Sequence, residues 1–183
     1  CLTLEGLFGQ ARVLISEAEQ RSHAYWQWQA ERQVDNLRET SRALLTTFNI
    51  RQLGDVLFEH LPGLGIPSAY LVLYENPAEP LEFAHLMLSY TEQGRAELAP
   101  TGWRFPTRQL LPPEFLPHQR RYSLVVEPLY FQDKPLGYVV FENGPREGDV
   151  YEQVRDNLSS AIQGALLFTE IQQARLTAEK ADR

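Results

Sequence analysis

The chain has 183 residues, of which 43% are hydrophobic and 22% are charged, as is typical of globular domains. Its net charge of −7 argues against general binding to nucleic acid, because that activity requires basic surface to neutralise phosphates. Cys1 is the single cysteine, which excludes an internal disulfide framework and favours a reducing, cytoplasmic location, and no apolar run is long enough to predict a membrane span.

Residues 1–48 are predicted to form one long helix, since no proline occurs between residues 5 and 48. A helix of about 40 residues measures about 60 Å, roughly twice the width of a small domain. We expect residues 37–48 to pack on the adjoining domain and the earlier part to need another partner. A heptad stripe with steps of four and three residues comprises Ala30, Val34, Leu37, Ser41, Leu44 and Phe48.

A mixed domain is predicted next. Asn49 is a good N-cap for a helix that ends at Pro62-Gly63. Strands are predicted over 68–74, 81–90, 95–98, 122–130 and 136–142, with 101–121 as a long loop that contains four prolines. Pro128 places strand 122–130 at an edge of the sheet, because proline cannot donate to a central ladder.

A final helix is predicted from Asp149 to the end of the chain, where no proline occurs. Its first half is apolar and its second half is rich in Glu, Gln, Arg and Lys. We therefore expect the first half to dock on the domain and the second half to extend from it. The predicted fold class is α+β, with an antiparallel sheet flanked by helices and long helices at both ends.

The hairpin sequence EPLYFQDKPLGYVVF, residues 127–141, resembles the penultimate hairpin of a GAF domain. The resemblance covers residues 49–165 and implies a GAF-like antiparallel sheet. With its flanking helices, the chain is similar to a segment of a multidomain bacterial sensor histidine kinase. That similarity implies a signalling helix over 1–48, a GAF-like domain over 49–165, and a linker helix over 166–183 leading to an output domain beyond this chain.

No catalytic residue is predicted. The four histidines lie 37, 25 and 33 residues apart, so no metal-ligand spacing is present and no metal is expected. The predicted domain lacks the pocket cysteines that GAF-type methionine sulfoxide reductases and covalent bilin attachment require. No phosphate-binding loop or phosphoacceptor histidine motif occurs, so we expect no cofactor, and kinase activity would lie in another module.

Two functions remain open. The first is a non-catalytic relay and dimerisation module, in which paired helices of two copies pass a conformational signal between neighbouring domains of the same polypeptide. No nucleic acid or membrane contact is expected of this segment. The stripe residues are interpreted as domain core, dimer seam or both. The residues predicted for the dimer interface are Ala30, Val34, Leu37, Leu44, Leu158, Ile162 and Ala165.

The alternative function is sensing of an anionic small molecule in a pocket between the sheet and loop 101–121. This loop carries four arginines against Glu114, and guanidinium groups favour carboxylates and phosphates. The competing interpretation is a solvated loop. The predicted ligand residues are Arg104, Arg108, Trp103 and Tyr90. The two functions differ in whether this interior is filled, and the aromatic residues Tyr70, Tyr90, Tyr122, Tyr138, Phe105 and Phe115 favour filling.

Overall fold

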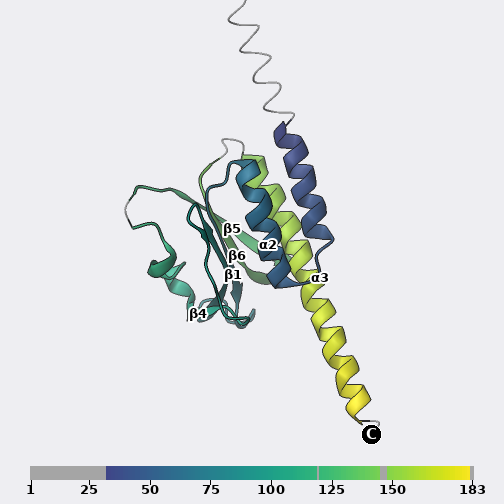
Figure 1. Ribbon diagram of the computed structural model, residues 1–183. Helices are drawn as coiled ribbons and strands as arrows, with labels where there is room; N and C mark the ends of the chain where they lie inside the picture. Colours follow the sequence, from purple (N-terminus) through teal and green to yellow (C-terminus); the bar gives the residue numbers. More distant parts are fainter. Residues whose placement is uncertain (1–31, 119, 145–147, 182–183) are drawn as a thin grey trace, which may run out of the picture. The chain divides into compact units, whose positions relative to one another are not determined.

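The computed structural model describes residues 32–118, 120–144 and 148–181 (Figure 1). The chain divides into two compact units, residues 1–36 and 37–183. In the first unit, the described residues 32–36 are helical. Most of the predicted N-terminal helix, including Ala30, lies outside the described residues. In the second unit, the first helix covers residues 37–45.

The second unit is α+β, as the sequence predicts. Within the described residues, six antiparallel strands form one sheet in the order β3-β2-β1-β6-β5, and β4 pairs with β2. The central position of β1 agrees with its nearly continuous apolar sequence. The strands are β1 (Ala69–Tyr74), β2 (Phe83–Thr91), β3 (Gly94–Arg95), β4 (Trp103–Pro106), β5 (Leu124–Phe131) and β6 (Lys134–Glu142).

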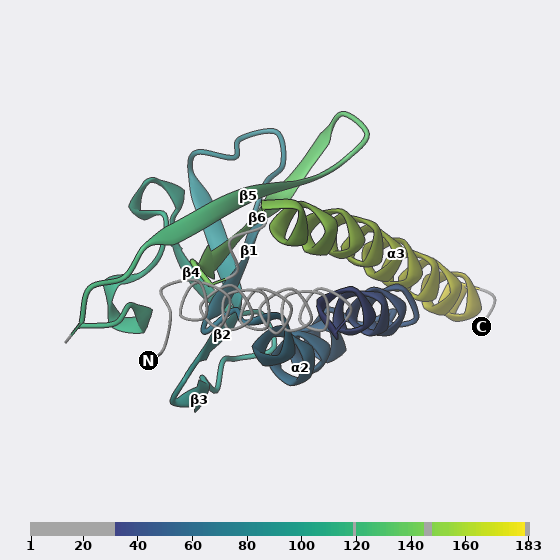
Figure 2. The ribbon, with the colours of Figure 1, turned by 90° about the horizontal axis from the view of Figure 1, so that it is seen from above.

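Helices cover one face of the sheet. Helix α2 (Ile50–His60) and helix α3 (Gly148–Ala181) lie on the same side of the strands (Figure 2). The predicted cap of α2 is confirmed, because the Asn49 side chain accepts a hydrogen bond of 2.8 Å from the backbone N–H of Arg51. A 3₁₀ turn, Leu61–Leu64, follows α2. The core between helices and sheet includes Leu44, Leu53, Leu71, Val139, Leu158 and Ile162.

The segment between β3 and β5 covers the opposite face of the sheet. The predicted loop 101–121 in fact contains strand β4 and two 3₁₀ turns, Thr107–Gln109 and Pro113–Phe115. The prediction missed β4 because it is only four residues long, ends in Pro106 and is defined by its pairing with β2. A second core therefore lies between the sheet and this segment, and it includes Tyr70, Val72, Leu86, Phe105, Tyr138 and Val140.

The predicted hairpin forms from β5 and β6, and β5 is an edge strand, as Pro128 indicates. Gly137 faces Leu73 of β1 across the ladder, and a Cβ at this position would overlap the carbonyl oxygen of Val72. Only glycine therefore allows β6 to approach the central strand this closely.

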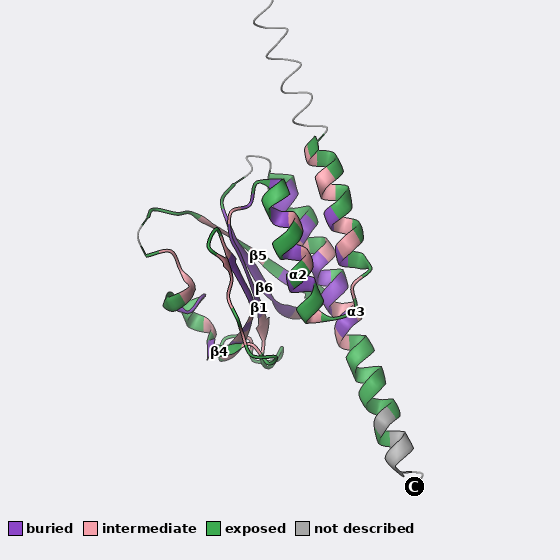
Figure 3. Cartoon of the chain, viewed as in Figure 1, coloured by how far each residue is buried: buried purple, intermediate pink, exposed green. Residues whose placement is uncertain are grey.

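Helix α3 is continuous over 34 residues, which corresponds to about 50 Å. One side of its first half is buried in the core, whereas residues 167–175 are exposed and extend past the domain (Figure 3). The predicted division of this helix into a docked half and an extending half is therefore confirmed. Among the described residues, no helix combines the length and apolar character that a membrane span requires.

Candidate functional site

The predicted ligand residues of β4 lie on opposite faces of the sheet. Trp103 and Phe105 share the face covered by the segment after β4, and Trp103 packs edge-on against Phe115 with ring centroids 5.7 Å apart. Arg104 lies between them in sequence and therefore on the other face. Its Nε donates to Glu75 Oε2 at 2.9 Å, and its guanidinium lies 3.5 Å from the centroid of the Phe83 ring.

The other two predicted ligand residues do not join them at one site. Arg108 is exposed on the 3₁₀ turn after β4. Tyr90 is buried on the helix-covered face, where its hydroxyl donates to the carbonyl oxygen of Ile66 at 2.9 Å and its ring contacts Phe58. Sequence order could not reveal this separation, because it depends on strand alternation and on the irregularity in β1–β2 pairing between Leu71 and Val72.

The interior between the sheet and the segment after β4 is filled by the chain's own aromatic residues. Tyr70, Phe105 and Tyr138 are at most 5% exposed. The Tyr70 hydroxyl donates to the carbonyl oxygen of Phe115 at 3.1 Å, and the Tyr138 hydroxyl donates to that of Leu110 at 2.6 Å. Burial raises the pKa of both phenols above the ordinary value of 10.0, so both remain protonated donors at neutral pH.

A charged cluster closes the edge of this interior. Glu142, the last residue of β6, is 5% exposed and accepts hydrogen bonds from Ser68 Oγ at 2.7 Å and from both terminal nitrogens of Arg120. The Arg120 guanidinium lowers the pKa of the Glu142 carboxyl despite burial, with a smaller contribution from Ser68. This ion pair ties the segment over the sheet to the strand that precedes α3.

A hollow of about 720 Å³ opens beside this ion pair. The turn between β2 and β3 forms one wall, and residues 114–118 with Arg120 form the other. Its lining includes Arg95, His118 and Arg120 as well as Glu92 and Glu114. Both arginines already have acidic partners, since Arg95 pairs with Asp55 and Arg120 with Glu142. An anion entering the hollow would compete with these carboxylates.

The residues predicted for the dimer interface differ in how far they are buried. Leu44, Leu158, Ile162 and Ala165 are at most 1% exposed in one chain, where they form core between the helices and the sheet. Leu37 packs partly against the same core, and Val34 of the first unit is 48% exposed. These four residues are therefore accounted for as core of a single chain, in agreement with the core interpretation of Leu44 in the stripe.

A different set of apolar side chains is exposed where the first helix ends. Phe48 and Phe168 have ring centroids 6.4 Å apart and are 57% and 49% exposed. Nearby positions on the same two elements, Leu45, Leu167 and Ile171, are 47–64% exposed. We call these five residues the apolar strip. The predicted stripe included Phe48 but none of the other four residues, because the sequence does not show where the sheet stops covering α3.

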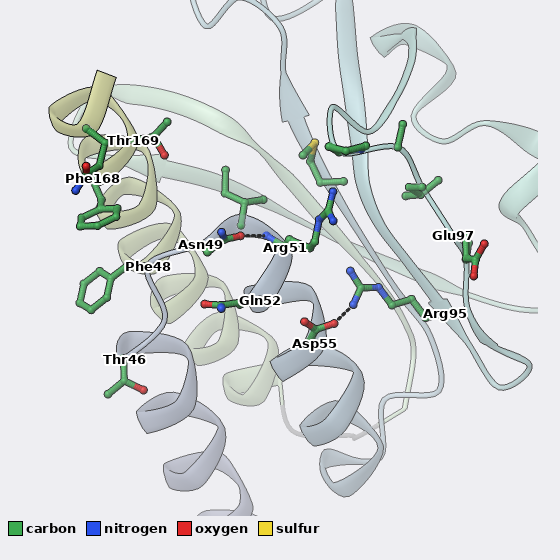
Figure 4. Close-up of a pocket in the computed structure, with 17 residues that line it drawn as sticks. Thr46, Phe48, Asn49, Arg51, Gln52, Asp55, Arg95, Glu97, Phe168 and Thr169 are labelled. Atoms are coloured by element: carbon green, nitrogen blue, oxygen red, sulfur yellow. Dashed lines mark hydrogen bonds and ion pairs between the residues drawn. The ribbon is translucent and has the colours of Figure 1, made fainter. Parts of the chain in front are cut away.

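A groove of about 1290 Å³ adjoins the apolar strip, as Figure 4 shows. Its walls come from Thr46, residues 48–52 and Asp55, from residues 95–100, and from Phe168, Thr169 and Gln172 of α3. Arg95 and Asp55 form an ion pair across it. The groove thus lies at the joint where the first helix turns into α2, beside the start of the exposed half of α3.

Among the residues that the structure describes, no group of three or more His, Cys, Asp or Glu side chains could hold a metal ion. His60, His85 and His118 lie on α2, on β2 and in the segment before β5, respectively. His85 Nδ1 lies 2.8 Å from the carbonyl oxygen of Thr101, which accounts for one ring nitrogen of this side chain. His23 lies outside the described residues.

A scan against protein-family models matched none of them, and no curated protein matches the chain.

Proposed function

We propose that this chain is a non-catalytic relay and dimerisation module of a signal-transduction protein, with a GAF-like domain between signalling helices. The observation that carries the proposal is the continuity of α3. One uninterrupted helix begins in the core, where Leu158 and Ile162 are fully buried, and continues through exposed residues 167–175. A displacement of the domain against its neighbours would therefore be transmitted along a rigid element.

The GAF-like assignment rests on topology together with the hairpin sequence. The hairpin of residues 127–141 adjoins the central strand β1, helices cover one face, and an irregular segment covers the other. In the similar kinases such domains lie between long helices. We accordingly propose a bacterial two-component sensor histidine kinase as the parent, a cytoplasmic location for this segment, and kinase activity in a module beyond it.

The proposed mechanism is mechanical and assigns no catalytic residue, metal or cofactor to the chain. The input is movement of the first helix, which is joined to α2 through Thr46–Asn49 and contacts α3 through the hydrogen bond from Asn157 Nδ2 to Ser41 Oγ at 2.7 Å. The output is the position of α3 relative to its counterpart in a second copy. Packed helical interfaces have discrete arrangements, so a small shift acts as a switch.

The first experiment is a measurement of the solution mass of the 183-residue chain by light scattering at physiological salt. The monomer mass is 21.0 kDa. We expect a stable species of about twice this mass, since the apolar strip would otherwise remain in contact with water. A monomer at tens of micromolar would overturn the dimeric relay.

The filled interior is the observation that ranks the relay above ligand sensing. The hollow beside Arg120 gives the second function a specific site. There, an anionic small molecule would replace Glu142 as the partner of Arg120. It differs from the predicted site at Arg104 and Arg108 in its residues but retains the chemistry. Thermal-shift measurements with organic acids and cyclic nucleotides test it, and a stabilising compound must lose its effect in Arg120→Gln and retain it in Arg104→Gln.

A further inference from the structure

A heptad pattern distinct from the buried stripe runs along α3. The positions Asn157, Ser160, Gly164, Leu167, Ile171 and Ala174 are spaced three and four residues apart in alternation. In heptad notation Asn157, Gly164 and Ile171 are a positions, and Ser160, Leu167 and Ala174 are d positions. The pattern becomes apolar only at Leu167, where α3 leaves the domain.

Two upstream positions of this pattern, Asn157 and Gly164, are partly covered by the first helix and the residues that follow it, whereas Ser160 is exposed. Asn157 donates to Ser41, and a Cβ at Gly164 would lie 3.9 Å from Phe48 Cδ1. At Asn49 the chain turns away into α2, so this cover ends. The next a position, Ile171, is 64% exposed, Leu167 is 47% exposed and Ala174 is also exposed. The a positions Asn157 and Gly164 are therefore partly covered by the chain itself, whereas the next a position, Ile171, is uncovered.

We infer that residues 167–175 of α3 pair with the same residues of a second copy in a parallel two-stranded coiled coil. This inference rests on the proposed function and names its interface. Leucine at d and isoleucine at a, here Leu167 and Ile171, is the combination that favours two parallel strands. The seam differs from the interface predicted from sequence, whose α3 residues Leu158, Ile162 and Ala165 are buried within one chain.

The charged residues on either side of the seam indicate that the partner is a second copy of this chain in parallel orientation. Glu170 is a g position and Arg175 is the following e position, and both are exposed. In a parallel pair, the g residue of one helix faces the e residue five positions later in the other. Each Glu170 then meets the partner's Arg175, twice by symmetry. An antiparallel arrangement would place Glu170 beside the partner's Glu170, which is repulsive.

Charge reversal on two separate chains tests this pairing. In Glu170→Arg, two arginines face each other across the dimer, and in Arg175→Glu, two glutamates do. We expect each variant alone to dimerise with a dissociation constant raised about tenfold. A mixture of the two variants restores both attractions. Differently tagged variants should therefore form a heterodimer in preference to either homodimer, as measured by co-purification and by solution mass.

The rescue is diagnostic because residues 170 and 175 are five positions apart and do not face each other on one helix. Cross-linking supplies an independent readout in a Cys1→Ser background. Ile171→Cys should form an intermolecular disulfide on mild oxidation, whereas Gln173→Cys, at an exposed c position away from the seam, should not. Circular dichroism of each variant serves as the control for folding.

The outcomes separate this inference from the proposed function. A dimer that shows neither heterodimer preference nor the Ile171→Cys cross-link overturns the seam and leaves the dimeric relay standing on another surface. A monomeric wild-type chain overturns both. Cross-linking at Gln173→Cys as efficient as at Ile171→Cys also overturns the seam, because it indicates collision rather than a fixed interface.

Discussion

Glu142 combines burial, charge and a position just ahead of α3. Its carboxylate accepts from Ser68 and Arg120, which lie in different segments of the chain. Because the Arg120 guanidinium holds the pKa of Glu142 below the ordinary value of 4.5, the folded state binds this proton less tightly than the unfolded state. The resulting stability is fully present above the unfolded-state pKa and is lost as pH falls through the folded-state pKa.

Glu142→Gln is therefore expected to lower the free energy of unfolding by about 1–3 kcal/mol at pH 7, because it removes a charged, buried acceptor. The difference from wild type should shrink as pH falls from 5 towards and below the folded-state pKa. Urea titrations between pH 7 and pH 3 measure it, with Glu97→Gln as a control at an exposed carboxylate. A difference that stays constant with pH would rule out the ion pair as its source.

At the scale of the element, α3 contains two isoleucines, nine positions apart, that differ in burial. Ile162 is fully buried and Ile171 is 64% exposed. Ile162→Ala is expected to lower the free energy of unfolding by about 2–5 kcal/mol, because it leaves a cavity in the core. Ile171→Ala, the matched control, should change monomer stability by no more than about 0.5 kcal/mol.

Urea unfolding at a concentration below the dimerisation range measures both values, and the solution mass at higher concentration completes the comparison. We expect Ile171→Ala, not Ile162→Ala, to weaken association without loss of the fold. Equal destabilisation by the two substitutions would mean that residue 171 is buried in the folded monomer, contrary to the structure.

Elements with local signals could be predicted from the sequence. The cap at Asn49, the edge strand with Pro128 and the β5–β6 hairpin each depend on residues close together in the chain. Features that depend on pairing could not. Strand β4 is defined by its contacts with β2. Alternation separates Trp103 from Arg104, and the irregularity in β1–β2 pairing separates Trp103 from Tyr90. The Glu142–Arg120 pair joins residues 22 positions apart.

Helical periodicity identifies the apolar face of α3 but not what that face contacts. Leu158, Ile162 and Ala165 follow a 4-3 spacing and were predicted for the dimer interface, but they are buried within one chain. The spacing could not tell core from interface, nor where the core ends along a continuous helix. That limit is set by the size of the domain. Beyond residue 166 the sheet no longer covers α3, so a second pattern offset by two residues, through Leu167 and Ile171, becomes the apolar one.

For the whole molecule, the division of α3 into a buried half and an exposed half implies that folding and association can be separated by truncation. A chain that ends at Glu170 keeps the buried residues of α3 and a further turn of helix, but it lacks Ile171 and Arg175. Its free energy of unfolding, measured for the monomer, should be within about 1 kcal/mol of the intact chain. Its solution mass should be that of a monomer under conditions in which the intact chain is a dimer.

The concentration dependence of thermal stability distinguishes the alternatives. Association stabilises a dimer by mass action, so the melting temperature of the intact chain should rise with protein concentration, whereas that of the truncated chain should not. If the truncated chain still dimerises, the interface lies on the domain itself, and the groove beside Phe48 becomes the surface to mutate. If it fails to fold, the exposed half of α3 supports the core, and the helix could not act as an independent output lever.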